Sequence, residues 1–588
     1  MADSPTLNTD GPLGVSIKVA GAATADTLMI ASVKVYKQIN RIPEAVVTIE
    51  TGSIPENDFP EIDGKDFDLG KAIEISAYFG ENDPGLLFKG KIYGKRMRIR
   101  GLKPPQMILT CRDNSAGLNV IKRTAQFKEK NDSDAMKQVI GNAGLTADVA
   151  AGKMSVQDQV QHNSTDWDFL RMLADRNGFV LVADDGTIKA SEPNTSGSEV
   201  LTLTLGVDII SFDAAVDTSG LIGAASGMSW DDSTQKTVSK TGDNPPALGW
   251  GNLTDATLSE IIGAQEHSFA APDMIEASDI GVMASARRLR SSLSALQGRC
   301  SFIGNALPLP DTVIEIVGVG DRFGGKAYVA GVEHKLEGGE WTTEVIMGLP
   351  DGWRSDSSDL GGADAAAIST PIPGLQIGKV VQIIEDPDAR LRIQIKLPMF
   401  GTEETLVWAR YAAPYSSGQA GIQFMPEKDD EVVVAFFNAD PNAPVILGSL
   451  HNGSNEQPYA PDDPNTFKAI VTKSQLKIEF EDQKKILTLE TPGGHSVVLS
   501  DDEESIVITD SNSNKMQMTS DGITLDSPGD ITLKAKGKIA LQATGDATVK
   551  GMNVELTAQT QFKASGAAGA EISSSGQTVV KGSIVMIN

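Results

Sequence analysis

The stretch DGITLDSP-GDITLKAK-GKIALQAT-GDATVKGM, residues 521–552, decides the fold of the C-terminal part of this chain. Each unit of eight residues places apolar side chains at its third and fifth positions, as Ile523 and Leu525 do in the first unit. A fixed short period indicates one structural unit per repeat, and this length allows one strand of about five residues and a turn. Two inward apolar side chains per unit are too few for a sheet to bury itself within one chain. We therefore expect several copies wound together, with strands that pair between chains.

The repeat predicts which side chains lie on the axis of such an assembly. The spacing slips by one residue after the fourth unit and then resumes. A single-chain β-solenoid is one alternative, although its turns usually carry a wider apolar set, and a disordered Gly/Ser tail is another. The predicted axis residues are Ile523, Leu525, Ile531, Leu533, Ile539, Leu541, Val554 and Leu556.

Length, charge and cysteine content exclude several classes of protein. A chain of 588 residues exceeds what one core organises, so we expect several domains. The formal net charge of −27 argues against general nucleic-acid binding and against anionic membrane surfaces. Two cysteines, Cys111 and Cys300, cannot form a disulfide scaffold or a four-thiolate zinc site.

Upstream of the repeat, short segments with period-two alternation and turn residues between them predict a mainly β chain. The polar stretch DGWRSDSSDLGGADAAAISTP, residues 351–371, is typical of a linker. We predict seven segments: a first β-barrel domain over 1–130, a small α/β domain over 131–200, a second β-barrel domain over 201–350, a linker over 351–371, an OB-fold domain over 372–455, a linker and β-meander neck over 456–515, and the octad needle over 516–588.

Helices are predicted in three places, near 132–145, 166–177 and 277–297. Thr165 with Asp168 three residues later is a capping-box arrangement, and Gly178 supplies a left-handed stop. In the third helix, the arginines at 287, 288 and 290 are expected on the solvated side, for solubility or as ion-pair partners.

We predict no catalytic, cofactor-binding or metal-ligating residue. The acidic clusters at 429–431 and 501–504 fall in turns, where carboxylates are normally solvated, although paired carboxylates can do acid–base chemistry when burial separates their pKa values. No two of the five histidines have metal-ligand spacing. His334 and Cys111 are expected to pack inside strands. GVGDRFGG at 318–325 lacks the Lys-Ser/Thr of a phosphate loop and is expected to connect a hairpin.

Several long motifs resemble the family of VgrG and contractile-phage tail-spike proteins. The most specific are GKVVQI at 378–383, RLRIQIKLPMFG at 390–401 and WARYAAPYSSGQAGIQFMPEKDDEVVVAFFNADPNAPVILGSLHN at 408–452, which resemble the OB module of that family. The helix–hairpin segment that begins HNSTDWDFL at 162 and the strands over 318–345 resemble its N-terminal half, and NSNKMQMTSDGITLDSPGDITLKA resembles its β-prism.

The resemblance implies a homotrimeric spike at the tip of a contractile injection machine. The N-terminal tube-like β-barrel domains with their small helices would join the tail tube and baseplate, the OB folds would form a collar, and an intertwined triple-stranded β-helix would be the puncturing needle. The sequence stops at GSIVMIN, directly on the repeat, so the apolar end needs a cap, and a PAAR-repeat tip protein is the family's usual one. The predicted tip-binding residues are Ile584, Val585, Met586, Ile587 and Asn588.

The expected function is therefore that of a structural spike, not an enzyme, without cofactor and with only transient contact with the target membrane. No signal peptide is visible in the first residues, so we expect synthesis in the cytoplasm, assembly into an injection particle and expulsion on contraction. Phage, type VI secretion and extracellular injection particles share these modules, and the resemblance leaves them open. The alternatives are a secreted β-solenoid adhesin or carbohydrate-binding protein, and a diverged cell-wall hydrolase.

Overall fold

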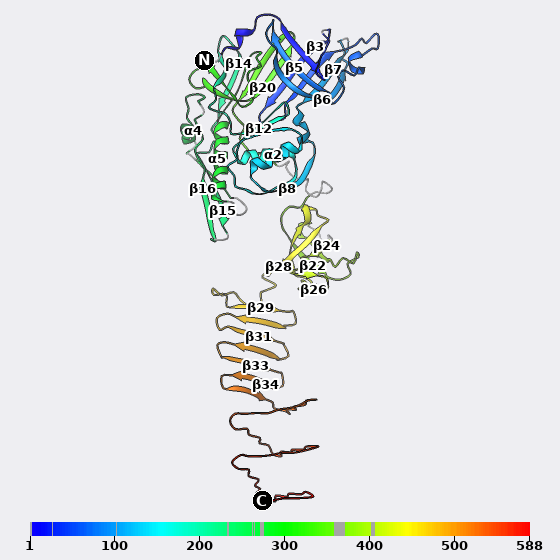
Figure 1. Cartoon of the computed structure of the whole chain (residues 1–588), viewed down its shortest axis with the longest axis vertical. Helices are drawn as coiled ribbons and strands as arrows, with labels where there is room; N and C mark the ends of the chain where they lie inside the picture. The colour runs from blue at the N-terminus through cyan, green and yellow to red at the C-terminus, as the bar shows by residue number, and fades with distance from the viewer. Residues whose placement is uncertain are drawn as a thin grey trace. The chain divides into compact units, whose positions relative to one another are not determined.

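The computed structural model describes residues 3–25, 27–101, 103–231, 234–247, 249–261, 263, 265–270, 276–357, 371–400 and 406–587 (Figure 1). The fold is mainly β, as the sequence predicts, with short helices inserted among the strands. The chain forms two compact units, the first built mainly from residues before 376 and the second mainly from those after it.

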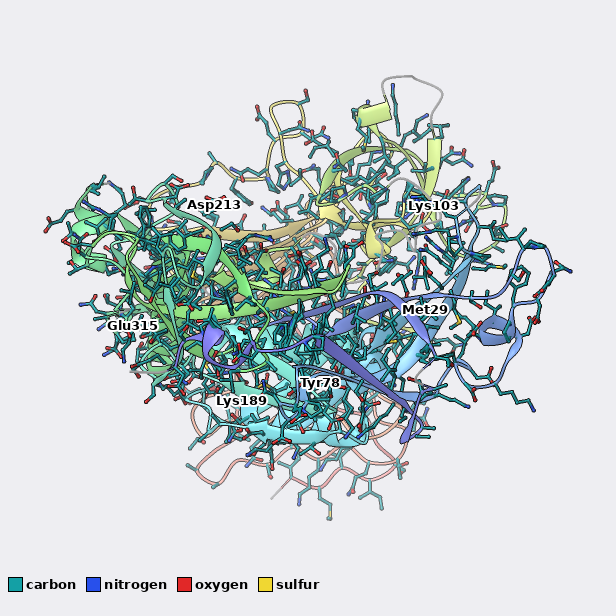
Figure 2. All side chains as sticks on the ribbon, turned by 90° about the horizontal axis from the view of Figure 1, so that it is seen from above. Met29, Tyr78, Lys103, Lys189, Asp213 and Glu315 are labelled. Atoms are coloured by element: carbon teal, nitrogen blue, oxygen red, sulfur yellow. The ribbon has the colours of Figure 1, made fainter. Side chains whose placement is uncertain are left out.

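A sheet of thirteen strands dominates the first unit. Its main path runs β14-β18-β21-β20-β3-β4-β7-β6-β5-β1-β2, with β13 and β19 attached beside β20. Figure 2 views it from above and labels Asp213 on β14 and Met29 on β3. The strands are β1 (Leu13–Val19), β2 (Ala22–Ala23), β3 (Met29–Gln38), β4 (Glu44–Glu50), β5 (Ala72–Phe79), β6 (Gly85–Arg98), β7 (Gln106–Arg112), β13 (Glu199–Thr204), β14 (Ile209–Val216), β18 (Leu296–Ile303), β19 (Thr312–Val317), β20 (Gly325–Glu337) and β21 (Glu340–Met347).

The two predicted barrel ranges share this one sheet. Strand β3 from the first range pairs antiparallel with β20 from the second, with Val35 opposite His334. The buried apolar side chains nevertheless form separate cores, one dominated by residues between Ile17 and Cys111 and the other by residues between Leu201 and Met347. The domain boundaries at 130 and 201 stay a prediction, because the sheet itself runs across both ranges.

The predicted small α/β domain has a core of its own between Leu118 and Ala190. Thr165 caps α3, where its hydroxyl accepts from the backbone N–H of Asp168 at 3.0 Å, and Gly178 follows the helix with φ +72°, as predicted. The side chain of Asn131 caps α2 by accepting from the backbone N–H of Asp134 at 2.8 Å. The elements are β8 (Lys122–Lys130), α2 (Asp132–Asn142), β9 (Thr146–Val149), β10 (Gln157–Thr165), α3 (Asp166–Arg176), β11 (Val180–Asp184) and β12 (Thr187–Ser191).

The arginines of the long helix α5 (Ala277–Ser294) were predicted to lie on its solvent-exposed side, and for two of them this prediction is wrong. Arg288 is 3% exposed and pairs with Asp255, while Arg290 is 7% exposed and pairs with Asp175. These guanidinium groups lie inside because acidic side chains from distant segments meet them there. The surrounding elements are β15 (Ala224–Asp231), β16 (Lys236–Thr241), α4 (Asp255–Ile261) and β17 (Glu266–Ala270), and the short α1 (Pro60–Asp63) lies earlier in the chain.

The predicted linker begins with packed structure. Trp353 is buried, and the guanidinium of Arg287 lies 4.0 Å from the centre of its ring. The 3₁₀ turn Arg354–Asp356 follows, and Arg354 Nε donates to Asp168 at 2.7 Å. Residues 358–370 of the predicted linker lie outside the described residues. Within the described ranges, no helix is both long and apolar enough to cross a bilayer.

In the second unit, five strands close a barrel in the order β22-β23-β24-β28-β27, as predicted for an OB fold (Figure 1). The pleat points one set of alternate side chains inward, and Val380, Ile393, Ile395, Val432 and Val434 are buried there. The strands are β22 (Gln376–Gln382), β23 (Ile393–Lys396), β24 (Leu406–Tyr411), β27 (Glu431–Phe436) and β28 (Pro444–Ser449), with a small hairpin of β25 (Ser416–Ser417) and β26 (Ala420–Gly421).

The remainder of the second unit begins with a seven-stranded antiparallel meander in sequence order, drawn as a ladder in Figure 1. It continues past the predicted start of the needle at 516, so the first repeat unit pairs with β34 inside the same chain. The strands are β29 (Phe467–Val471), β30 (Lys477–Glu481), β31 (Ile486–Glu490), β32 (Ser496–Ser500), β33 (Ser505–Thr509), β34 (Lys515–Thr519) and β35 (Gly522–Asp526).

The buried pair between Asp175 and Arg290 gives a test of the first unit. Arg290 Nη2 lies 2.7 Å from Asp175 Oδ1, and both side chains are at most 8% exposed. Asp175→Ala leaves an uncompensated buried charge, so we expect it to lower the free energy of unfolding by about 3–5 kcal/mol in urea denaturation. The control is Asp134→Ala, which breaks an exposed pair with Lys137 and should change that free energy by less than about 1 kcal/mol. Equal effects of the two substitutions would contradict the buried pair.

Candidate functional surface of the C-terminal sheet and repeat

The seven-stranded meander carries a continuous apolar face. From β30 to β35 each strand places two apolar side chains on this face, and each faces an apolar side chain of the next strand, as Ile478 faces Leu489 and Leu489 faces Val497. None of them is buried. The apolar face consists of Ile478, Phe480, Leu487, Leu489, Val497, Leu499, Ile506, Ile508, Met516, Met518, Ile523 and Leu525.

A groove of about 820 Å³ follows one column of this face, and its lining extends from Ile478 through Leu525 to Ile531. Ile531 belongs to the second unit of the repeat. The apolar face of the sheet and the apolar positions of the repeat are therefore parts of one surface.

Across β30–β35 the opposite face is mostly polar, apart from Ile486, Val498 and Val507. The first strand, β29, adds Phe467, Ala469 and Val471 to that face. Lys477 lies on it, 2.6 Å from Glu490 and 3.3 Å from Glu479. The hydrogen bond to Glu490, with a smaller effect of Glu479, raises the pKa of Lys477 above its ordinary value. The two faces differ as expected for a sheet with water on one side and an apolar partner on the other.

The predicted axis residues are all exposed in the single chain, with exposed fractions between 51% and 88%. Beyond β35 the chain runs back and forth in extended passes without strand arrows (Figure 1), and residues 527–587 form no strand pairing within the chain. Contiguous apolar surface of this extent marks an interaction surface. Its packing partners are not supplied by the described part of the chain itself.

The described residues of the predicted tip are also exposed in the single chain. Ile584, Met586 and Ile587 are at least 80% exposed, and Val585 is 48% exposed. Asn588 lies outside the described residues. Whether these residues bind a tip protein stays a prediction.

The residues considered as candidates for catalysis or ligand binding are buried in the core or lie in a connection between strands. Cys111 is fully buried, which raises the pKa of its thiol to about 12, and Cys300 is buried in the same way. His334 is buried on β20, and its Nδ1 lies 3.0 Å from the hydroxyl of Thr343. Residues 318–325 connect the antiparallel strands β19 and β20, as predicted. None of these positions assembles a reactive group with a neighbouring base.

The acidic clusters lie in turns, as expected. Residues 501–504 connect β32 to β33, and 429–430 precede β27. Asp429 lies 2.9 Å from Lys379, whose hydrogen bond lowers the pKa of that carboxyl. Among the described residues, no group of three or more His, Cys, Asp or Glu side chains is arranged to hold a metal ion.

The apolar face upstream of the repeat was not predicted. Its signal is present in the sequence as apolar pairs separated by one residue, which begin at 478, 487, 497, 506, 516 and 523. The turns between these strands differ in length, so the pairs do not recur at the fixed eight-residue period that identifies the repeat. The apolar face is therefore visible in the sequence as one apolar pair in each predicted strand, and not as a fixed period.

Along the chain, the closed five-stranded barrel is followed by the seven-stranded meander. Residues 376–451 match the family described as the Type VI secretion system/phage-baseplate injector OB domain. Residues 9–338 match the family described as the Alg8 N-terminal domain. Because this second match covers more than half of the sequence, the chain belongs to the Alg8 N-terminal domain family.

Two relatives from Vibrio cholerae serotype O1 confirm the resemblance to the VgrG family. The type VI secretion system spike protein VgrG3 is 33% identical over 86 residues, which is 14% of this chain and 8% of that protein. The actin cross-linking toxin VgrG1 is 25% identical over 138 residues, which is 22% of this chain and 12% of that protein. The chain thus spans about a tenth of the length of these relatives.

The solved structures to which the chain shows some similarity include phage and secretion-system proteins. The 43 kDa tail protein of prophage MuSo2 from Shewanella oneidensis is 13% identical, with a TM-score of 0.43, and the alignment covers 58% of this chain and 99% of that one. The c3393 protein of E. coli, described as a component of the type VI secretion system, is 13% identical with a TM-score of 0.36, over 74% of this chain and 99% of that one.

The buried His334 predicts a pH dependence of stability. Burial, with the nearby charge of Lys37, lowers the pKa of His334 from 6.5 to about 3. The unfolded chain takes up this proton below about pH 6.5 and the folded chain does not, so the free energy of unfolding falls as the pH drops from 6.5 toward 3. At pH 5 this loss is about 2 kcal/mol relative to pH 7.

The substitution His334→Gln should remove that contribution and flatten the pH profile between pH 5 and 6.5, as measured by chemical denaturation. His267→Gln, at an exposed histidine, is the control and should keep the original slope. Identical slopes for the unmodified protein and His334→Gln would show that this histidine is not buried in its neutral form.

Proposed function

We propose that the chain is the central spike of a phage-tail-like contractile injection machine and that it acts as a homotrimer. The observation that carries this proposal is the single apolar surface formed by the apolar face of the meander and the repeat. Burying one Leu or Ile side chain lowers the free energy of the assembly by about 1.5–3 kcal/mol relative to leaving it exposed. Each strand is therefore stabilised when another chain packs over its two apolar side chains. Identical chains around one axis provide that cover along the whole length.

Interchain pairing also satisfies the backbone. Within the chain, β35 forms one edge of the meander, and residues 527–587 have no strand partner. Unpaired backbone groups on an extended segment are a template for pairing with another chain. When strands of neighbouring copies lie between successive passes of one chain, the backbone bonds and the apolar packing are completed by the same association.

The proposed mechanism is mechanical. Contraction of a sheath supplies the work, and the needle applies the force to a small area of the target envelope. A rod without internal voids or hinges resists buckling, because close-packed interiors are stiff. The protein needs no catalytic group, metal or cofactor for this task, and we propose that it is not an enzyme.

The proposed partners differ between the repeat and the N-terminal domains. The exposed residues 584–587 would bind a PAAR-like tip protein, and the N-terminal sheet domains would join tail tube and baseplate proteins. We further propose that the protein is made in the cytoplasm, is assembled into the injection particle and is expelled on contraction.

The repeat should hold the trimer together. We expect native mass spectrometry of the full chain to show three copies, and a variant that ends at Asp526 to dissociate at lower protein concentration while its N-terminal domains stay folded. Ending the chain at Asp526 keeps all seven strands of the meander and removes residues 527–588, of which the described ones form no strand pairing within the chain. Equal resistance of both proteins to dissociation, or a full-length chain that is monomeric, would contradict the proposal.

A point substitution tests the axis. Leu533→Asp places three carboxylates together in a dry interior, where unpaired charges are strongly unfavourable, so we expect loss of the heat- and SDS-resistant trimer. Thr532→Asp is the control, because alternate side chains of an extended strand point to opposite faces. Loss of the resistant trimer in both variants or in neither would rule out the assigned axis position.

A further inference from the structure

Two adjoining cavities in the first unit gather positive charge in a strongly acidic protein. They measure about 580 and 370 Å³, and both are lined by Asn40, Arg41, Arg171 and Arg354. Among the described residues, the larger cavity is also lined by Arg112, Lys122, Glu44 and Asp168, and the smaller one by Arg290, Asp351 and Asp356. The net charge of the whole chain is −27, so this concentration of cations runs opposite to the rest of the molecule.

Arg171 lines both cavities. It projects from α3, and its Nε is fully enclosed without a hydrogen-bond partner among the described residues. Burial lowers the pKa of its guanidinium, and the positive charges of Arg290 and Arg354 add to this effect, whereas Asp175 and Asp168 oppose it. A guanidinium nevertheless remains charged in proteins, so Arg171 is a half-buried cation on the cavity lining.

The nearest carboxylates are already engaged by other groups. Asp168 accepts from Arg354 Nε at 2.7 Å and from the Thr165 hydroxyl at 2.8 Å. Asp175 accepts from Arg290 Nη2 and from the backbone N–H of Arg354, both at 2.7 Å. These bonds fix Arg354 and Arg290 in place without using the Nε of Arg171.

Asn40, which also lines both cavities, is held in position by hydrogen bonds. Asn40 lies in the turn between β3 and β4 with φ +59°, and its backbone N–H and side-chain oxygen bond to Leu181 at 2.7 and 2.9 Å. Backbone strain of this kind persists only where the surroundings fix it. The next residue, Arg41, lines both cavities and is exposed to solvent. The cationic groups around the cavity are therefore preorganised and not merely near one another.

We infer that the cavity around Arg171 binds an oxyanion, either a carboxylate or a phosphate group, which accepts a hydrogen bond from Arg171 between Arg41 and Arg354. Guanidinium groups present planar donors that suit these two anions, and charge-assisted bonds of this type are short and strong. The inference does not depend on the spike function, because it rests on the first unit alone.

The test is isothermal titration calorimetry of the full chain with two probes, sodium phosphate and N-acetyl-glutamate, each compared with sodium chloride at the same ionic strength. We expect saturable binding of at least one probe. Tighter binding of phosphate identifies a phosphate-bearing ligand, and tighter binding of N-acetyl-glutamate identifies a carboxylate-bearing one. The absence of binding above the chloride control for both probes would overturn the inference.

Variants locate the binding in the cavity. Arg171→Gln should weaken it about tenfold or more, because it removes a charged donor. Arg41→Gln, at an exposed side chain that does not support the fold, should weaken it by a smaller factor. Arg96→Gln, at an exposed arginine on β6, is the matched control and should bind as the unmodified protein does. Unchanged affinity in Arg41→Gln and in folded Arg171→Gln would overturn the assignment, as would equal weakening in Arg96→Gln.

Discussion

The C-terminal fifth of this protein depends on one constraint, which is that a strand with two apolar side chains on one face cannot bury them by itself. From Ile478 onward, the meander and the repeat present this minimal apolar pair strand after strand, and the single chain leaves it uncovered. In the meander the backbone bonds are made within the chain. Residues 527–587 of the repeat form no strand pairing within the chain, so backbone pairing and apolar cover must come from the same neighbours.

Local patterns predicted those features that depend on local physics. The capping of α3 by Thr165 follows from one side chain and the backbone three residues later. The closed barrel over 376–449 was predicted from the resemblance of a long motif to a known OB module. The axis positions assigned to the repeat come from its period and stay a prediction. In each case the information needed lies within a few residues of the element that it describes.

Features that depend on distant segments were not predictable in this way. Helical periodicity places Arg288 and Arg290 on a polar side of α5, but it cannot show that Asp255 and Asp175 approach that side. The pairing of β3 with β20 is likewise a matter of tertiary register. The surroundings of Arg171 combine a helix, a strand turn and a segment predicted as linker, so no stretch of sequence contains the pattern. The upstream apolar face is different, because its signal was local and only the irregular turn lengths concealed it.

Hydrogen exchange of the full-length protein at native concentration tests the central claim most directly, because residues 527–587 have no internal strand pairing. If neighbouring copies complete the sheet, amides in this range should exchange as slowly as those of β30–β34. Exchange within seconds across 527–587, with the meander still protected, would show that the repeat has no partner strands and would contradict the account.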